Sequence, residues 1–465
     1  MNKKQFIAGL LCCSFVATAF AVTPNNMQIW LKDGGQQVFD ISEVDSVTFG
    51  EAQQLEYRPL MENTMIPVFS KPNPLVISEQ ELPYVKATNE FGTKCYAEIR
   101  KSSKSGVNFF SPISLNIALG LCANGADGIG AYEITKALGF RSDNAIDDMN
   151  NFFKKITLSL YSNVDSVTVR TANALWLNEN SIVNMDFVKT AQEKYFATVR
   201  HLDFKNDPSG SKDTIDHWAA LMTNNCIDKL NVKINEFTRF VINNACYFKG
   251  SWVKKFTPTG KFLFNGMNDQ KDSTYFMRVA DEYFEYYETD DYQVVKLDYG
   301  ISEDKPASSQ YQPYTPSNSS YSMIVLLPRI KIDLDSVLPT VRWDSIPFEP
   351  VKGVIYMPKF KAAGGYPLKE ILKKFNIEQI FNTCPNVVYR EPIYVSEVQQ
   401  DFFINVDEDG TEAAAVTSII GVAGGAAIKS FDMYCNRPFA FAIRENKSGL
   451  LLFIGEYDSV PESKE

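Results

Sequence analysis

The sequence predicts one large α+β domain with extended antiparallel sheets, preceded by a short N-terminal element. Segments with strand patterns and helix patterns are mixed along the chain without regular alternation, which is typical of the α+β class. A length of 465 residues would by itself predict two or more domains. No Pro-, Gly- or Ser-rich linker divides residues 85–457, however, and 45% hydrophobic residues, including 33 Phe, supply material for one large core.

The first residues have the pattern of a secretory signal peptide. Lys3 and Lys4 precede an apolar stretch over residues 6–21, and small residues at Ala19 and Ala21 suit cleavage after Ala21. We therefore expect residues 1–21 to be a signal peptide. The mature protein is expected to be exported, to the periplasm, the cell surface or the medium.

The cysteines leave a second interpretation of the leader open. A lipid anchor on Cys12 or Cys13 is the alternative, although Leu11 is bulkier than the residue that a lipoprotein signal has before its cysteine. No other stretch approaches 18 apolar residues, so no transmembrane span is expected. The remaining cysteines show no metal or redox spacing, and we expect buried free thiols. They are Cys95, Cys122, Cys226, Cys246, Cys384 and Cys435.

Residues 22–83 predict a short β element followed by a linker. Two strand-like runs between residues 27 and 50 surround an Asp33-Gly34 turn, and they resemble a small N-terminal element of exported Bacteroidetes proteins. Such a short hairpin cannot bury a core by itself. Repeated prolines in residues 51–83 indicate a linker or a draped strand. The main domain is expected over residues 84–459, with a tail at 460–465.

The elements of the main domain follow from their residue patterns. Apolar residues at helical spacing from Phe91 to Ile99 predict a first helix, and Ser111 before Pro112 predicts the start of the next. Another helix is expected over Asp213–Ile227, and the Ser/Pro/Tyr/Gln-rich segment Ser302–Ser320 predicts an inserted surface loop. Strands are expected at Val167–Leu177, Arg239–Phe248, Ser322–Leu327, Val354–Lys361, Asp401–Val406, Phe439–Arg444 and Leu450–Gly455.

Composition and motifs argue against an enzyme. The formal net charge of −10, or −12 once Lys3 and Lys4 leave with the leader, disfavours nucleic acid, polyanions and anionic lipid as partners. His201 and His217 are the only histidines, and both have a structural explanation in a strand-like turn and an amphipathic segment. No hydrolase, zinc-protease or nucleotide-binding motif occurs. We expect no catalytic residue, no metal and no cofactor.

The segment Glu408–Thr417 is the most informative part of the chain. It reads Glu-Asp-Gly-Thr-Glu-Ala-Ala-Ala-Val-Thr, and small or apolar residues then continue without a charge to Lys429. No proline occurs between Asp401 and Arg437. This composition suits a segment that slides between two existing strands, because large side chains would collide and proline would remove ladder hydrogen bonds. An Ala/Gly-rich surface linker is the alternative.

Four segments are informative when they are taken together: Glu408–Ala415, Asn108–Ser114, Asn244–Trp252 and Asn436–Ile443. In this order they resemble the loop hinge, the second helix, the Asn-aliphatic-Phe-Lys-Gly-x-Trp strand and the C-terminal signature of the serpin family. Ala440 departs from that signature, because a larger apolar residue is usual there. The resemblance covers roughly Tyr84–Tyr457. It implies the serpin fold, with three β-sheets, about eight to nine helices and an exposed reactive-centre loop.

The resemblance implies an inhibitor that acts as a suicide substrate. In this family a protease attacks the loop and forms an acyl-enzyme. The freed part of the loop then inserts as a new strand into the central sheet, which drags the protease along and distorts its active site. The implied hinge comprises Glu408, Gly410, Thr411, Glu412, Ala413, Ala414, Ala415, Val416 and Thr417.

The resemblance also implies roles in the central sheet. Glu408 is expected to pair with Lys359 where insertion begins, and Trp252 to pack in the same region. A polar cluster beneath the sheet is expected to let its two halves part, with the members Ser111, Ser114, Asn244 and Gln400. The family often has histidine at the last of these positions. Glutamine also donates and accepts hydrogen bonds but does not titrate, so no pH sensitivity is expected there.

The scissile bond is expected within Val422, Ala423, Gly424, Gly425, Ala426 and Ala427. Counting from Gly410 by the family's hinge length places it between Gly424 and Gly425, whereas counting back from Pro438 places it nearer Ala427. These small residues suit an elastase-like or subtilisin-like serine protease. A papain-like cysteine protease is the next choice, and Lys429 would attract a trypsin-like enzyme only if the loop were used off-register.

A second function class stays open. A serpin that has lost inhibition would act as a binding or structural protein, and such members commonly carry bulky, charged or Pro residues in the hinge. Between Thr411 and Thr417 this chain has none apart from Glu412, which favours the inhibitor. The expected partner is therefore a target protease, and the protein is expected to be a monomer.

Overall fold

The chain divides into two compact units, residues 1–60 and 61–465. The computed structural model describes residues 26–30, 36–40, 73–103, 106–161, 167–179, 181–301, 317–389, 393–411 and 430–461. The first unit contains an antiparallel pair of strands, β1 (Asn26–Trp30) and β2 (Gln36–Asp40). The two predicted short strands are therefore present, and residues 41–50 lie outside the described part.

A six-stranded sheet of the large unit positions the candidate site. Its strands are, in spatial order, β12 (Phe360–Pro367), β13 (Gln399–Val406), β14 (Gly410–Thr411), β6 (Phe240–Ser251), β4 (Thr168–Asn178) and β5 (Thr198–Leu202). β13 and β6 run parallel to each other, whereas the pairs β12–β13 and β4–β6 are antiparallel. β6 and β4 are buried along almost their whole length, which explains their nearly continuous apolar sequences.

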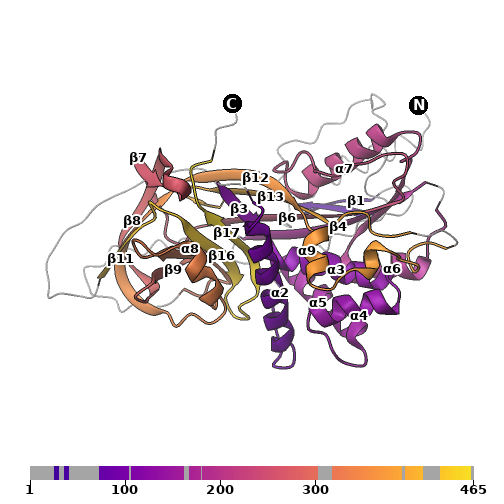
Figure 1. Ribbon diagram of the computed structural model, residues 1–465, viewed down its shortest axis with the longest axis horizontal. Helices are drawn as coiled ribbons and strands as arrows, with labels where there is room; N and C mark the ends of the chain where they lie inside the picture. Colours follow the sequence, from indigo (N-terminus) through magenta and orange to yellow (C-terminus); the bar gives the residue numbers. More distant parts are fainter. Residues whose placement is uncertain are drawn as a thin grey trace. The chain divides into compact units, whose positions relative to one another are not determined.

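Helices lie on both sides of this sheet (Figure 1). On one side, α7 (Pro208–Met222) packs Trp218 edge-on against Trp176 of β4, with ring centroids 5.9 Å apart. The other side carries α2 (Leu82–Arg100), α3 (Pro112–Gly125), α4 (Gly128–Ala137), α5 (Ala145–Leu160), α6 (Met185–Tyr195) and α9 (Lys369–Lys374). α3 is buried on nearly every side, and Ser111 caps it as predicted by accepting the N–H of Ser114.

The second sheet has nine strands. Its strands are β15 (Ser430–Tyr434), β11 (Glu349–Pro358), β8 (Lys271–Glu288), β9 (Tyr292–Tyr299), β10 (Tyr321–Pro328), β16 (Phe439–Glu445), β17 (Leu451–Tyr457) and β3 (Val107–Phe110), with β7 (Thr257–Asn265) beside β8. The helix α8 (Leu334–Val337) and 3₁₀ turns at Met267–Asp269, Leu338–Thr340 and Gln379–Phe381 complete the elements.

The α+β fold class is confirmed, with eight α-helices in the described residues. The expected three sheets of the domain appear there as two. The reason is β8, a strand of 18 residues that pairs with β11 over most of its length and with β9 at its end, and so joins two groups of strands. The two large sheets meet where Phe109 of β3 stacks on Phe453 of β17, with the ring of Phe402 of β13 against its edge.

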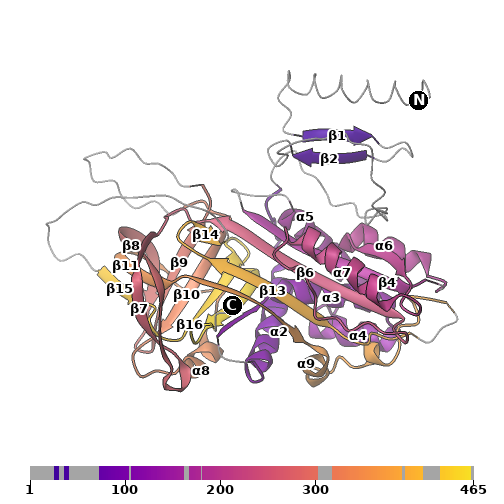
Figure 2. The same cartoon turned by 90° about the horizontal axis from the view of Figure 1, so that it is seen from above.

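Two element boundaries differ from the sequence prediction. The helix expected over Asp213–Ile227 spans Pro208–Met222, because Asn224 and Asn225 take φ of 52° and 60° and turn the chain out of the helix. The strand expected over Val354–Lys361 is two strands. β11 ends at Pro358 and β12 begins at Phe360, so the chain passes from one sheet to the other. Figure 2 shows from above β11 beside β8 in one sheet, and β13, the partner of β12, beside β6 in the other.

The structure also bears on the predictions for the cysteines, for membrane-spanning helices and for the inserted loop. The six cysteines of the described part form no disulfide; five of them are buried and Cys226 is half-buried. Within that part no helix is long and apolar enough to cross a membrane. Of the predicted insertion Ser302–Ser320, only residues 317–320 are described.

Candidate functional site

The six-stranded sheet has an unfilled strand position between β13 and β6, which we call the slot. The two parallel strands pair directly only where Gln399–Asp401 meet Asn243–Ala245. At the other end β14 lies between them, antiparallel to both: Thr411 pairs with Val406 of β13 and with Gly250 of β6. Between these ends, no strand of the described part pairs with residues 402–405 or 246–249 on the sides facing each other.

Close packing explains why the chain enters the slot at Gly410 and Thr411. A Cβ on Gly410 would lie 2.1 Å from the carbonyl oxygen of Gly250, so no larger residue fits there. The hydroxyls of Thr411 and Tyr299 form a hydrogen bond of 2.7 Å, and Thr411 is 1% exposed. The start of β14 is therefore fixed by backbone pairing on both sides and by one buried side-chain contact.

Trp252 lies at the same end of the slot as β14, as the resemblance predicts. Its indole Nε1 donates to the carbonyl oxygen of Asp407 at 2.9 Å, and its backbone N–H donates to that of Asp409 at 2.8 Å. The indole also stacks on Tyr299, with centroids 4.5 Å apart. The indole thus connects the end of β6 with the turn that leads from β13 into β14.

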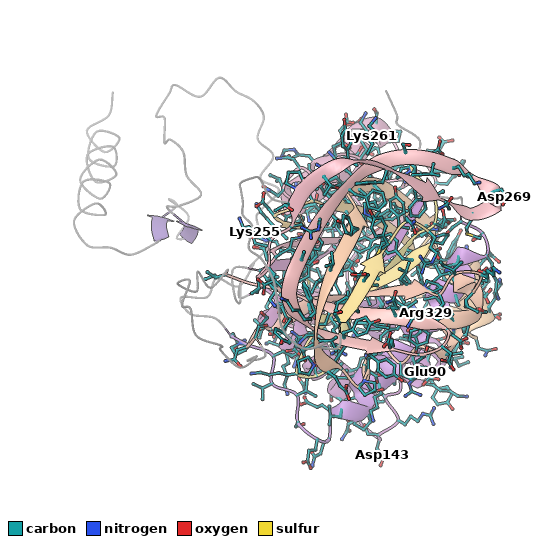
Figure 3. The ribbon with its side chains drawn as sticks, turned by 90° about the vertical axis from the view of Figure 1, so that its left-hand side faces the viewer. Glu90, Asp143, Lys255, Lys261, Asp269 and Arg329 are labelled. Carbon is teal, nitrogen blue, oxygen red and sulfur yellow. The ribbon has the colours of Figure 1, made fainter. Side chains whose placement is uncertain are left out.

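Two lysines pair with the acidic turn. The expected ion pair is present, with Lys359 Nζ 3.0 Å from Glu408 Oε1. Lys255 Nζ lies 2.9 Å from Asp409 Oδ1. This pair was not predicted, and the only signal for it in the sequence is that Lys255 follows Trp252 by three residues. Figure 3 labels Lys255 in the view onto the end of the unit that carries β8 and β11. Both lysines are partly exposed, so each pair stabilises the turn by ~1 kcal/mol or less.

The predicted polar cluster lies at the end of the slot where β13 and β6 pair directly, which we call the closed end. The Ser114 hydroxyl donates to Asn244 Oδ1, and Asn244 Nδ2 donates to Asn173 Oδ1 at 2.9 Å. Gln400 exchanges two hydrogen bonds with the backbone of Ser111: its Nε2 donates to the carbonyl oxygen (3.1 Å), and its Oε1 accepts the N–H (2.7 Å). Gln400 and Asn244 are direct neighbours across β13 and β6, so the cluster joins the two strands to the buried helix α3.

Two members of this cluster were missed. Asn173 on β4 extends it across one more strand. Cys246 on β6 is buried beside the hydroxyls of Ser111 and Ser114, and burial raises the pKa of its thiol to about 12. Neither residue could be found from local sequence, because the role of an isolated Asn or Cys in a strand depends on which side chains contact it in the folded protein.

The remaining predicted site residues lie outside the described part. These are the hinge residues Glu412–Thr417 and the bait window Val422–Ala427. The described chain ends at Thr411 beside β6 and resumes at Ser430, which begins β15 and pairs with Lys352 of β11. Residues 412–429 therefore connect two different sheets.

The histidines lie away from the slot. His201 is exposed on β5, and His217 is exposed on α7. The described residues contain no group of three or more His, Cys, Asp or Glu side chains that could hold a metal ion. The described part of the site consists of backbone ladders and a buried polar cluster.

Comparison with known proteins agrees with this architecture. The family model described as serpin (serine protease inhibitor) matches residues 86–459. Serpin B3 of Homo sapiens is 29% identical over 404 residues, covering 80% of this chain and 98% of that protein. The leukocyte elastase inhibitor of Xenopus tropicalis is 27% identical over 391 residues, covering 80% and 98%.

A solved structure shows the same fold. Serpin48 of the insect Tenebrio molitor, described as a highly specific serpin, superposes with a TM-score of 0.70 at 26% identity, over 83% of this chain and 100% of that one. The family model covers most of the chain in one continuous match, including every described residue of the slot. The protein belongs to the serpin family, whose members are generally inhibitors of proteases.

Proposed function

We propose that this protein inhibits a protease as a suicide substrate and traps it as a covalent acyl complex. The observation that carries the proposal is the position of β14, which already lies between two parallel strands at one end of an unfilled strand position. From Thr411 the chain continues into a run of small residues without proline. Cleavage within residues 412–429 would free this run to extend β14 through the slot.

The strand register supports the extension. Continuing the pairing of Thr411 with Val406 and Gly250 would bring Ala413 beside Ile404 and Phe248, both buried. Because strand side chains alternate between faces, Ala413, Ala415 and Thr417 would share the buried face with Thr411. Small residues at these positions would enter between large apolar neighbours without collision.

The energy released on extension is large enough for trapping. A new central strand adds on the order of ten backbone hydrogen bonds at ~0.5–1.5 kcal/mol each, together with apolar burial. The gain is therefore roughly 5–15 kcal/mol or more, which can drive a conformational change that competes with deacylation. The intact form is metastable by the same amount.

The residues of the bait window favour a serine protease with a shallow specificity pocket. Val422–Ala427 contains only small side chains, which suits elastase-like and subtilisin-like enzymes. A relative of this chain is named for leukocyte elastase, which agrees with this choice. A papain-like cysteine protease that recognises the preceding residue is the second candidate.

The test is incubation with a panel of elastase-like and subtilisin-like proteases, read on a denaturing gel. We expect an adduct of one protease with one inhibitor that survives SDS, with cleavage mapped by mass to a bond within Val422–Ala427. A catalytically inactive protease of the same kind is the control and should give no adduct. Plain cleavage by every active protease would leave a non-inhibitory serpin as the better function.

We further propose that the protein is exported before it meets its target. The basis is the signal-like segment of residues 1–21. Expression with the native leader should yield a mature protein that begins at Val22. A mature protein that begins at a lipid-modified Cys12 or Cys13 would instead establish the anchored form.

A further inference from the structure

The chain between α7 and β6 crosses the sheet beside the slot, and we call residues 223–239 the strap. It leaves α7 through the turn at Asn224 and Asn225 and enters β6 at Phe240. Midway, the backbone N–H of Leu230 donates to Asp216 of α7 at 2.9 Å. α7 is itself fixed to the β4 and β5 side of the sheet through Trp218. The strap therefore belongs to the half of the sheet that contains β6.

One contact of the strap reaches the other half. Asn231 Nδ2 donates to Asp401 Oδ1 at 2.9 Å, and the backbone N–H of Asn231 points to the same oxygen at 3.4 Å. Asp401 belongs to β13, on the far side of the slot from the strap's two anchors. It is 3% exposed, whereas Asn231 is exposed. This contact spans the line along which β13 and β6 meet.

The residues around Asp401 provide both space and hydrogen-bond donors for its carboxyl group. Gly365 is its partner on β12, where a Cβ would lie 2.4 Å from Asp401 Oδ1, so the side chain lies over a position kept free by glycine. Burial raises the pKa of Asp401, while the donors on Asn231 and the charge of Lys212 act in the opposite direction. A carboxyl buried to this degree needs such partners, because an unpaired buried polar group is costly.

We propose that the Asn231–Asp401 hydrogen bond is a clasp that holds β13 against β6 and sets how readily the slot opens. Asp401 and Ala245 are direct neighbours across the two strands. A strand placed between them must increase the distance between the two strands from one strand spacing, about 4.8 Å, to about twice that value. β13 then moves away from the strap, so the bond must break at the step that admits a new strand. The consequence for trapping rests on the proposed function, whereas the effect on slot opening does not.

Hydrogen exchange on the uncleaved protein tests the clasp directly. The amides of residues 243–245 and 399–401 form the closed end of the slot. In Asn231→Ala they should exchange roughly tenfold faster than in the wild type, because a hydrogen bond to a charged group shifts an equilibrium by about that factor or more. The substituted residue is exposed, so the variant should fold. Asp401→Asn should change the same amides in the same direction.

A matched control is present in the strap itself. Asn235 is also exposed, and its Oδ1 accepts a local hydrogen bond from the N–H of Phe237 at 2.9 Å. Asn235→Ala should leave exchange at the slot unchanged. Unchanged exchange in Asn231→Ala, or an equal increase in Asn235→Ala, would overturn the clasp. Faster exchange in Asn231→Ala together with no adduct from the wild type would sustain the clasp and reject the inhibitory function.

Discussion

At the scale of single residues, the entrance of the slot depends on side chains that permit close approach. Gly410 fits because nothing larger can lie against the Gly250 carbonyl, and Thr411 fits because its hydroxyl meets the buried hydroxyl of Tyr299. Burial raises the pKa of that tyrosine well above its ordinary value, so its hydroxyl stays protonated and keeps this hydrogen bond across the ordinary pH range. These contacts hold Gly410 and Thr411 of the predicted hinge in place before any cleavage.

Replacing Thr411 tests this arrangement. Thr411→Arg introduces a long charged side chain at a position that is 1% exposed, so the start of β14 should leave the slot. The loop would still be cleaved, but insertion would be too slow to trap the protease. We expect most of the adduct to be replaced by cleaved inhibitor on a denaturing gel. Thr340→Arg, at an exposed position, should behave like the wild type.

The Lys359–Glu408 pair should contribute little to stability despite its position. Its side chains are 35% and 20% exposed, and ion pairs of this kind contribute ~1 kcal/mol or less. Lys359→Gln should therefore lower the thermal midpoint by only about 2 °C or less. Differential scanning calorimetry of the uncleaved protein measures this. A loss of many degrees would mean that the pair governs the closed state of the slot.

At the scale of elements, β13 makes the contacts that would have to break for the sheet to part. β13 is joined to β6 by three paired residues, to α3 through Gln400 and Ser111, and to the strap through Asp401. All of these contacts lie at the closed end of the slot. The opposite end is already separated by β14, so opening should proceed from β14 towards Gln400.

A histidine at position 400 should make this opening sensitive to pH. Gln400 Oε1 accepts the N–H of Ser111, and the wild-type side chain does not titrate. In Gln400→His, the neutral ring can accept this bond, whereas the imidazolium cannot. The contact should therefore be lost as pH falls through the histidine pKa, which has an ordinary value near 6.5 and is lowered by burial.

The measurement for this variant is the rate of adduct formation between pH 5 and 8, expressed as the ratio of variant to wild type. The ratio removes the contribution of other groups, including the raised pKa of the neighbouring Asp401 and any effect of pH on the protease. We expect the ratio to change below pH 6.5. A constant ratio would show that the Gln400–Ser111 contact does not influence insertion.

At the scale of the whole molecule, the uncleaved protein should be the less stable form. Its six-stranded sheet includes β14, which is only two residues long, and cleavage within residues 412–429 would allow residues from Thr411 to about Gly421 to extend β14 into a full strand. Cutting a loop loosens most proteins. Here it should complete the sheet.

Limited proteolysis by an enzyme that is not trapped tests whether cleavage stabilises the protein. Cleavage within Val422–Ala427 should raise the thermal midpoint by tens of degrees, since 1 kcal/mol shifts a domain of 150–250 residues by roughly 2–4 °C and a larger one by less. The fluorescence of Trp252, stacked on Tyr299 at the entrance, should change on insertion. A cleaved form that melts at or below the intact one would show that the loop does not insert.

Part of this structure could be predicted from local sequence. Ser111 before Pro112 gave the start of α3, and runs of β-branched and aromatic residues gave β4, β6, β13, β16 and β17 to within a few residues. The Glu408–Lys359 pair followed from the resemblance of the segment 408–415 to a known hinge. These features depend on interactions within a few residues or on a motif with a known place in the fold.

The sequence by itself determined the fold class and the family, and it predicts which segment is suited to insertion. Only the tertiary structure decided which residues meet at the slot: the hydroxyl contact of Tyr299 with Thr411 joins positions 112 residues apart, and the Asn231–Asp401 contact joins positions 170 apart. It also decided that the chain changes sheets at Lys359, between β11 and β12. The physical reason is that caps and periodicity act between neighbours in the chain, whereas register and strand separation depend on packing between distant segments.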